Sequence, residues 1–171
     1  MILASSWSLA FGQSNSTEDN HKKRLHELAK VQLASIERDA LNIWELAEVG
    51  FQEYKSSGIL QGRLADAGFE IERGLAGMTT SFVAKYRNGD GPVIGLLAEY
   101  DALLGLTQYS ISERKPLDDR QAGHGCGHNL LGTGSTGAAI ILKQWMEGND
   151  VKGEIRLYGC PADSTNIIDL Q

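Results

Sequence analysis

Residues 123–137, with the sequence GHGCGHNLLGTGSTG, constrain the fold more than any other stretch of this chain. Six of these residues are glycine, so the backbone can bend there without steric penalty and present several side chains toward one point. His124, Cys126 and His128 alternate with the glycines. Imidazole and thiolate are ligands that zinc and similar metals take readily. The stretch therefore predicts a metal-binding loop, which the rest of the chain must hold in place.

Length, composition and charge describe an ordinary globular chain. The 171 residues fit one domain with a real core, and hydrophobic and charged residues make up 42% and 22%. The net charge is −6, and residues 22–24 are the one cluster of Lys and Arg. We therefore expect no nucleic-acid partner and no anionic membrane surface. No apolar run reaches the roughly 18 residues that a membrane-spanning helix needs.

The first 17 residues are interpreted as a leader or the remnant of a signal peptide. They are moderately apolar but lack the positively charged start of an export signal. A cytoplasmic location is expected, and export to the periplasm is the alternative. The two cysteines are too few for a disulfide framework. A single bridge is possible, but Cys126 stands among histidines, which favours a metal-binding thiol.

Hydrophobic periodicity predicts an α/β fold, a layered sheet with flanking helices. Helices are expected at residues 18–49, 56–67 and 130–148, and strands at 69–72, 79–87, 92–98 and 154–160. In the first helix, apolar residues recur at steps of three and four: Leu25, Ala29, Leu33, Ile36, Ala40, Ile43 and Ala47. The Asn-Gly-Asp-Gly sequence at 88–91 predicts a hairpin between the second and third strands. The third strand is apolar almost throughout, as a strand covered on both faces would be. Residues 103–122 are expected to form an irregular, functional loop.

Candidate reactive residues follow two of the predicted strands. Glu99 and Asp101 come at the end of the third strand, and Cys160 and Asp163 at the end of the fourth. Residues two apart on an extended backbone share one side, so both acids can point into one crevice. Alone, such acids are ordinary loop residues, and Cys160 is an ordinary small core residue. Together with the loop at 123–137 they predict a site at the strand ends.

The run GTGSTG at 132–137 also matches the G-x-G-x-x-G pattern of dinucleotide-binding proteins. That fingerprint needs a strand directly before it, and here a loop is expected. A nicotinamide or flavin oxidoreductase therefore stays a remote alternative. The glycines are better explained as letting a helix begin close against the sheet.

The segments IWELAEVGFQEYKSS, IGLLAEYDAL, GHGCGHNLLGTGSTGAAI and IRLYGCPA occur in this order between residues 42 and 162. Together they resemble the aminoacylase-like family of metal-dependent amidohydrolases and peptidases, in the branch that includes p-aminobenzoyl-glutamate hydrolase. The resemblance implies the N-terminal half of a zinc-peptidase-like catalytic domain, with two metal ions, manganese or zinc, at the carboxyl edge of the sheet. The implied reaction is attack of metal-bound water on the amide bond of an N-acyl amino acid or dipeptide-like substrate such as p-aminobenzoyl-glutamate.

The resemblance also implies roles for individual residues. Cys126 and His128 would be metal ligands, with His124 beside the site. Asp101 would orient a ligand, and Glu99 would stand where related peptidases place a ligand histidine. Related enzymes continue after the CPA segment with two glutamates, a general base and a metal ligand, where this chain has Asp163 and Ser164. Asp163 is therefore the candidate catalytic base.

Three segments are therefore expected: the leader at 1–17, a partial catalytic domain at 18–162 and a tail at 163–171 that diverges from the family pattern. Complete members add further ligand histidines and a small dimerisation domain, so a homodimer is expected only for the complete protein. Two hypotheses about the function of this chain follow. The chain is either a metal-dependent amidohydrolase or a truncated, catalytically inactive fragment of such an enzyme.

Overall fold

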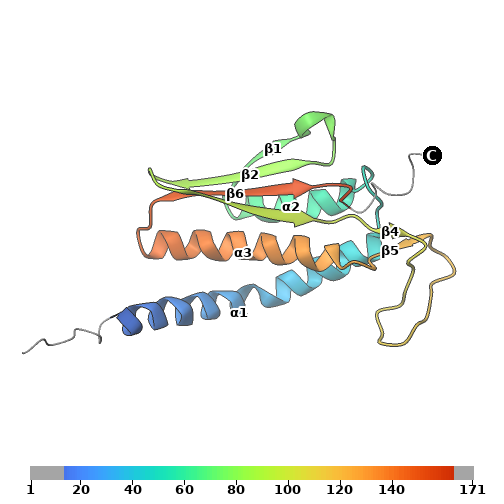
Figure 1. Ribbon diagram of the computed structural model, residues 1–171, viewed down its shortest axis with the longest axis horizontal. Coiled ribbons are helices and arrows are strands. Elements are labelled where there is room, and N and C mark those ends of the chain that lie inside the picture. Colours follow the sequence, from blue (N-terminus) through green and yellow to red (C-terminus); the bar gives the residue numbers. More distant parts are fainter. Residues whose placement is uncertain (1–13, 164–171) are drawn as a thin grey trace, which may run out of the picture.

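The computed structural model describes residues 14–163, which form a four-stranded mixed sheet with its helices packed on one face (Figure 1). The helices are α1 (Ser14–Leu46), α2 (Tyr54–Asp66) and α3 (His128–Gly148), with a short 3-10 turn η1 (Leu75–Gly77). The sheet contains β1 (Glu70–Arg73), β2 (Phe82–Asn88), β3 (Val93–Glu99) and β6 (Gly153–Cys160). A separate two-stranded ladder is formed by β4 (Leu103–Leu104) and β5 (Ala122–Gly123). The predicted α/β class is confirmed.

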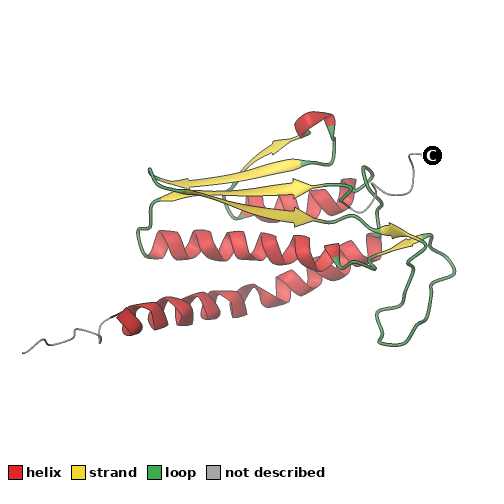
Figure 2. Cartoon of the chain, viewed as in Figure 1, coloured by secondary structure: helices red, strands yellow, loops and turns green. Residues whose placement is uncertain are grey.

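The contacts between elements define three layers: the sheet, then α2 and α3, and then α1. α2 lies against β1 and β2, and α3 lies against β3 and β6. α1 packs on the outer side of α3 and also touches α2 (Figure 2). The core lies between the sheet and α2 and α3, and its fully buried side chains include Leu60, Leu64, Phe82, Tyr100, Ile155 and Leu157. Burial of each such side chain contributes about 1.5–3 kcal/mol, which makes this interface the main source of stability.

The strand order is β1-β2-β6-β3, so the predicted hairpin between β2 and β3 is wrong. β6 lies between them, antiparallel to β2 and parallel to β3. The turn that follows Asn88 instead connects β2 to β3 across the start of β6. There, Asn88 Nδ2 donates to the Val151 carbonyl at 2.7 Å. At its other end, the Glu154 amide donates to the Pro92 carbonyl at 2.9 Å. The Asn-Gly signal predicts a local turn correctly, but it carries no information about a strand that enters from later in the chain.

β3 is an edge strand in the described part of the chain. Val93 is 53% exposed and Leu97 is 60% exposed, so the expectation of cover on both faces is wrong for residues 14–163. The pairing partner of β3 there is β6 alone. An apolar edge strand of this kind is a site where another strand can pair.

The helices begin earlier than the sequence patterns indicate. α1 starts at Ser14 rather than Glu18, inside the segment interpreted as a leader, and α3 starts at His128 rather than Leu130. On α1, Ala40 and Ile43 are buried as expected, whereas Leu33 is 52% exposed. An apolar stripe marks the buried face of a helix and does not mark the residue at which the helix begins.

Residues 1–13 and 164–171 lie outside the described part, and with them most of the predicted leader and of the predicted divergent tail, including Ser164. Among residues 14–163, no helix combines the length and the apolar character required to span a bilayer.

Candidate metal centre

The carboxyl ends of β3 and β6 build the candidate site. The two strands run parallel and in register, with Glu99 opposite Cys160, so the residues that follow each strand emerge at the same edge of the sheet. Glu99 and Asp101 leave β3 there, and Asp163 leaves β6. Strands that are far apart in the sequence thereby bring three carboxylates into one region.

The β4–β5 ladder brings the glycine-rich loop to this edge. Leu103 pairs with Gly123 and Leu104 with Ala122, which closes the base of the long loop between them. The chain therefore returns to the exit of β3 just before residues 124–128 and the start of α3. The sequence pattern predicted an irregular loop at 103–122 and missed this ladder, because strands of two residues carry no recognisable periodicity.

His128 lies between two of the carboxylates. Its Nδ1 is 2.7 Å from Asp101 Oδ1, and its Nε2 is 3.0 Å from Glu99 Oε2. The Asp101 side chain is fully buried and that of His128 is 6% exposed. A carboxylate that accepts the Nδ1 proton sets the tautomer and the ring orientation, and directs Nε2 outward as a ligand atom. Glu99 and Asp101, two residues apart, thus act on opposite nitrogens of one ring.

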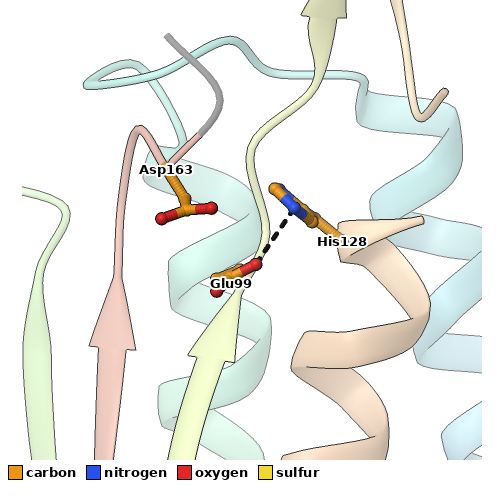
Figure 3. A group of neighbouring side chains, drawn as sticks. All are labelled: Glu99, His128 and Asp163. Atoms are coloured by element: carbon orange, nitrogen blue, oxygen red, sulfur yellow. Dashed lines mark ion pairs between the residues drawn. The ribbon is translucent and has the colours of Figure 1, made fainter. Parts of the chain in front are cut away.

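Glu99, His128 and Asp163 form a group whose ligand atoms all lie within 4.8 Å of one another (Figure 3). Burial, and after it the nearby carboxylates of Asp163 and Asp101, raises the pKa of Glu99, while His128 acts in the opposite direction. Crowded carboxylates around an imidazole repel one another, and a cation held among them would remove that repulsion. One nitrogen and two oxygen donors are a ligand set that zinc and manganese accept. The residues present therefore fit a divalent metal ion.

Cys126 lies outside this group, and the structure leaves its thiol exposed. His124 is also apart from it: its Nε2 lies 3.0 Å from the Ile43 carbonyl oxygen, and burial lowers its pKa. Cys160 is half-buried, and burial, together with Glu99 and Asp163, raises the pKa of its thiol. Of the two ligands predicted from the sequence, the structure brings His128 into the group and leaves Cys126 beside it.

The run at 132–137 lies within α3 and not in a turn between a strand and a helix, which is contrary to the dinucleotide-binding interpretation. A β-carbon added at Gly132 would overlap the Glu99 carbonyl oxygen and lie 3.2 Å from Leu60 Cδ1. One at Gly137 would overlap the end of the Ile36 side chain. Gly132 thus lets α3 approach the exit of β3, and Gly137 lets α1 approach α3. The predicted close approach of a helix to the sheet is therefore supported at Gly132, whereas Gly137 faces α1 and Gly134 has open space around it.

From the sequence, no role is assigned to Glu53, which lies between two of the predicted helices. It is fully buried directly before α2, and its carboxylate accepts the backbone N–H of Ala162 at 2.9 Å. Glutamate is almost never fully buried unless it is paired, and its partners here are distant in the sequence, so no local signal distinguishes it.

No protein-family model matches the chain. Individual relatives do match. The chain is 42% identical over 122 residues to a subunit of p-aminobenzoyl-glutamate hydrolase from Escherichia coli, a match covering 71% of this chain and 25% of that protein. It is 30% identical to N-acetyl-L-cysteine deacetylase of Bacillus subtilis, across 85% of this chain and 33% of that one.

Comparison with solved structures indicates the same kind of protein as these sequence relatives. A dinuclear metal binding peptidase of the M20 family from Bacillus subtilis superposes with a TM-score of 0.65 at 25% identity, covering 78% of this chain and 36% of that chain. The chain belongs to this family of metal-dependent amidohydrolases and peptidases. The aminobenzoyl-glutamate utilization protein of Klebsiella pneumoniae shares the fold, with a TM-score of 0.56 at 18% identity over 81% of this chain and 38% of its own. The chain spans between a quarter and about two fifths of the length of these family members.

Proposed function

We propose that this chain forms the metal-binding part of an amidohydrolase that cleaves the amide bond of an N-acyl amino acid or dipeptide-like substrate, such as p-aminobenzoyl-glutamate. The observation that carries the proposal is the group of Glu99, His128 and Asp163 at the strand ends, with Asp101 behind His128. The names of the M20 relatives, a p-aminobenzoyl-glutamate hydrolase and an N-acetyl-L-cysteine deacetylase, support the amide substrate class.

In this proposal Glu99, His128 and Asp163 hold one divalent ion, manganese or zinc. A bound divalent ion supplies a nucleophile by lowering the pKa of a coordinated water, and it polarises the substrate carbonyl. Asp101 accepts the Nδ1 proton of His128 and keeps Nε2 directed at the ion site.

Asp163 has two candidate roles, ligand and general base. Its position in the group supports the first, and the family pattern at this strand end supports the second. Asp163→Asn separates them. If Asp163 is a ligand, the variant loses affinity for Mn²⁺ in a competition assay with a chromophoric chelator. If it is a base alone, affinity is retained and turnover is lost.

Cys126 is proposed as a further ligand, from its place two residues before His128 and its exposed thiol. The chain loaded with Co²⁺ tests this, because a cobalt–thiolate bond gives an intense charge-transfer absorption that cobalt held by N and O ligands lacks. Cys126→Ser should abolish the band, and its absence from the parent chain would exclude the thiol as a ligand.

The second candidate function is a non-catalytic fragment that binds metal without turnover. The ligand set supports it, because within residues 14–163 the group of Glu99, His128 and Asp163 offers donors for one ion, and a dinuclear centre needs more ligands than these three. The test is hydrolysis of p-aminobenzoyl-glutamate and several N-acyl amino acids by the chain with added Mn²⁺ or Zn²⁺, with His128→Ala as the matched control. Turnover that His128→Ala abolishes would refute the fragment hypothesis. Metal analysis adds an independent readout, since a complete dinuclear centre retains two ions per chain.

Two further proposals concern the cellular location and the oligomeric state of the protein. A cytoplasmic location is supported by its two free thiols, Cys126 and Cys160, and fractionation of the expressing cells tests it. A homodimer is proposed for a complete protein of this family, and light scattering on the complete protein tests it.

A further inference from the structure

Glu53 is a buried carboxylate that the proposed chemistry does not use. It is 0% exposed, and burial of a charged group away from water is unfavourable unless it is hydrogen-bonded. Both of its oxygens have partners: Oε2 accepts the Thr80 hydroxyl at 2.8 Å, and Oε1 accepts the Ala162 amide at 2.9 Å. The second bond joins residues 109 positions apart in the chain. This carboxylate therefore ties the start of α2 to the exit of β6.

The exit of β6 takes an unusual conformation at the residue that Glu53 holds. Ala162 has φ of +59°, in the left-handed region that residues with a side chain rarely adopt. It is 3% exposed, so its amide has no access to bulk water. Asp163 follows directly, so the direction of its side chain depends on this turn (Figure 3).

The same hydrogen-bond network reaches the exit of β3. The Thr80 carbonyl accepts the hydroxyls of Tyr100 and Ser57, each at 2.7 Å. Tyr100 is fully buried and lies between Glu99 and Asp101 in the chain. The polar groups around Glu53 thus contact both strand exits that supply carboxylates to the metal centre.

We propose that Glu53 is a positioning residue of the metal centre: by accepting the Ala162 amide it holds the turn that directs Asp163 toward Glu99 and His128. This role rests on the proposed metal site. Glu53 lies behind the ligands and acts on the metal through the backbone of Ala162.

The first test measures the affinity of the full chain for Mn²⁺ with and without this carboxylate. Glu53→Ala removes both acceptors, and we expect affinity to fall about 10- to 100-fold, as for loss of a partner that orients a ligand. Glu53→Gln keeps an amide oxygen for Ala162 and should restore most of the affinity. Leu64→Ala is the matched control, because Leu64 is a fully buried core residue of α2, the helix that follows Glu53, and its apolar side chain makes no hydrogen bond to the turn. It should lower stability and leave affinity unchanged.

The second test is independent of metal. Amide hydrogen exchange of the metal-free chain should show faster exchange at Ala162 in Glu53→Ala than in the parent, while amides in the middle of β6 remain protected. In Leu64→Ala the exchange at Ala162 should rise only as far as that of the β6 amides. Equal exchange at Ala162 in parent and Glu53→Ala would overturn the positioning role.

The outcomes separate this role from the proposed function. If the parent chain binds Mn²⁺ and Glu53→Ala binds it equally well, the positioning role is refuted and the metal centre stands. An affinity loss of the same size in Leu64→Ala would also refute it, since general destabilisation would then account for the effect. If the parent chain binds neither Mn²⁺ nor Zn²⁺, the metal centre and the role of Glu53 fail together.

Discussion

Gly132→Ala compared with Gly134→Ala tests how α3 is seated against the metal centre. Both glycines lie in the same turn of α3. A β-carbon at Gly134 has no atom within 4 Å, whereas one at Gly132 overlaps the Glu99 carbonyl oxygen. The obstacle is backbone at the end of a paired strand, so it cannot rotate away as a flexible side chain would.

The magnitudes follow from two opposing effects. Replacing glycine by alanine inside a helix stabilises it by about 1 kcal/mol, and this gain is common to both variants. Overpacking at Gly132 costs about 1–3 kcal/mol, because the helix must move away from β3. Gly134→Ala should therefore raise the free energy of unfolding by about 1 kcal/mol. Gly132→Ala should lie about 1–3 kcal/mol below it.

Urea unfolding monitored by circular dichroism measures both free energies, and equal slopes of the two transitions would show that the unfolded states are comparable. The displacement also moves His128 relative to Glu99, so Gly132→Ala should weaken Mn²⁺ binding while Gly134→Ala does not. Two variants of equal stability and equal affinity would refute the close approach of α3 to the strand exit. Nicotinamide or flavin binding that Gly132→Ala alone abolished would instead support the dinucleotide-binding alternative.

Three further predictions concern the charged and reactive groups at the strand ends. Asp101→Asn should reduce Mn²⁺ affinity about 10- to 100-fold with an unchanged circular dichroism spectrum, because His128 loses the carboxylate at its Nδ1 that orients the ring. Unchanged affinity would contradict that orienting role. Glu99 has a raised pKa in the folded chain, caused first by burial, so the native state binds a proton more tightly than the unfolded state. The stability of the metal-free chain should consequently rise as pH falls through that raised pKa. Glu99→Gln should stabilise the metal-free chain at neutral pH and should flatten the dependence of its melting temperature on pH in thermal melts. Iodoacetamide should modify the exposed Cys126 well before Cys160, whose thiol pKa is raised by burial; mass spectrometry of the digested chain would show the reverse order if the two environments were wrongly assigned.

The sequence predicts the elements of this chain better than their arrangement. Apolar periodicity locates α1, α2, α3 and the four sheet strands to within a few residues, because helix and strand periods are properties of neighbouring residues. It is wrong about the surroundings of β3, whose apolar residues suggested a strand covered on both faces, because the pattern reports side-chain type and not which elements lie alongside. The insertion of β6 between β2 and β3 has no local signal at all.

For the candidate site as well, the sequence predicts the residues better than their arrangement in space. Glu99, Asp101 and Asp163 were candidates because they follow predicted strands, and His128 was a predicted ligand in the glycine-rich loop. The motifs around these residues indicated the family that the comparisons then showed. Their distances were not predictable, because they depend on the parallel register of β3 and β6 and on the β4–β5 ladder. Cys126 was predicted together with His128 because the family resemblance implied both as metal ligands.

The sequence by itself determined the family, the α/β class and the residue types available to a metal, because motifs and periodicity are properties of residues that are close together in the chain. Only the tertiary structure decided that Glu99 and Asp163 meet His128, and that Glu53 holds the amide before Asp163. The physical reason is that these contacts join segments distant in the chain. Their geometry is set by sheet register and by buried hydrogen bonds, neither of which leaves a local pattern.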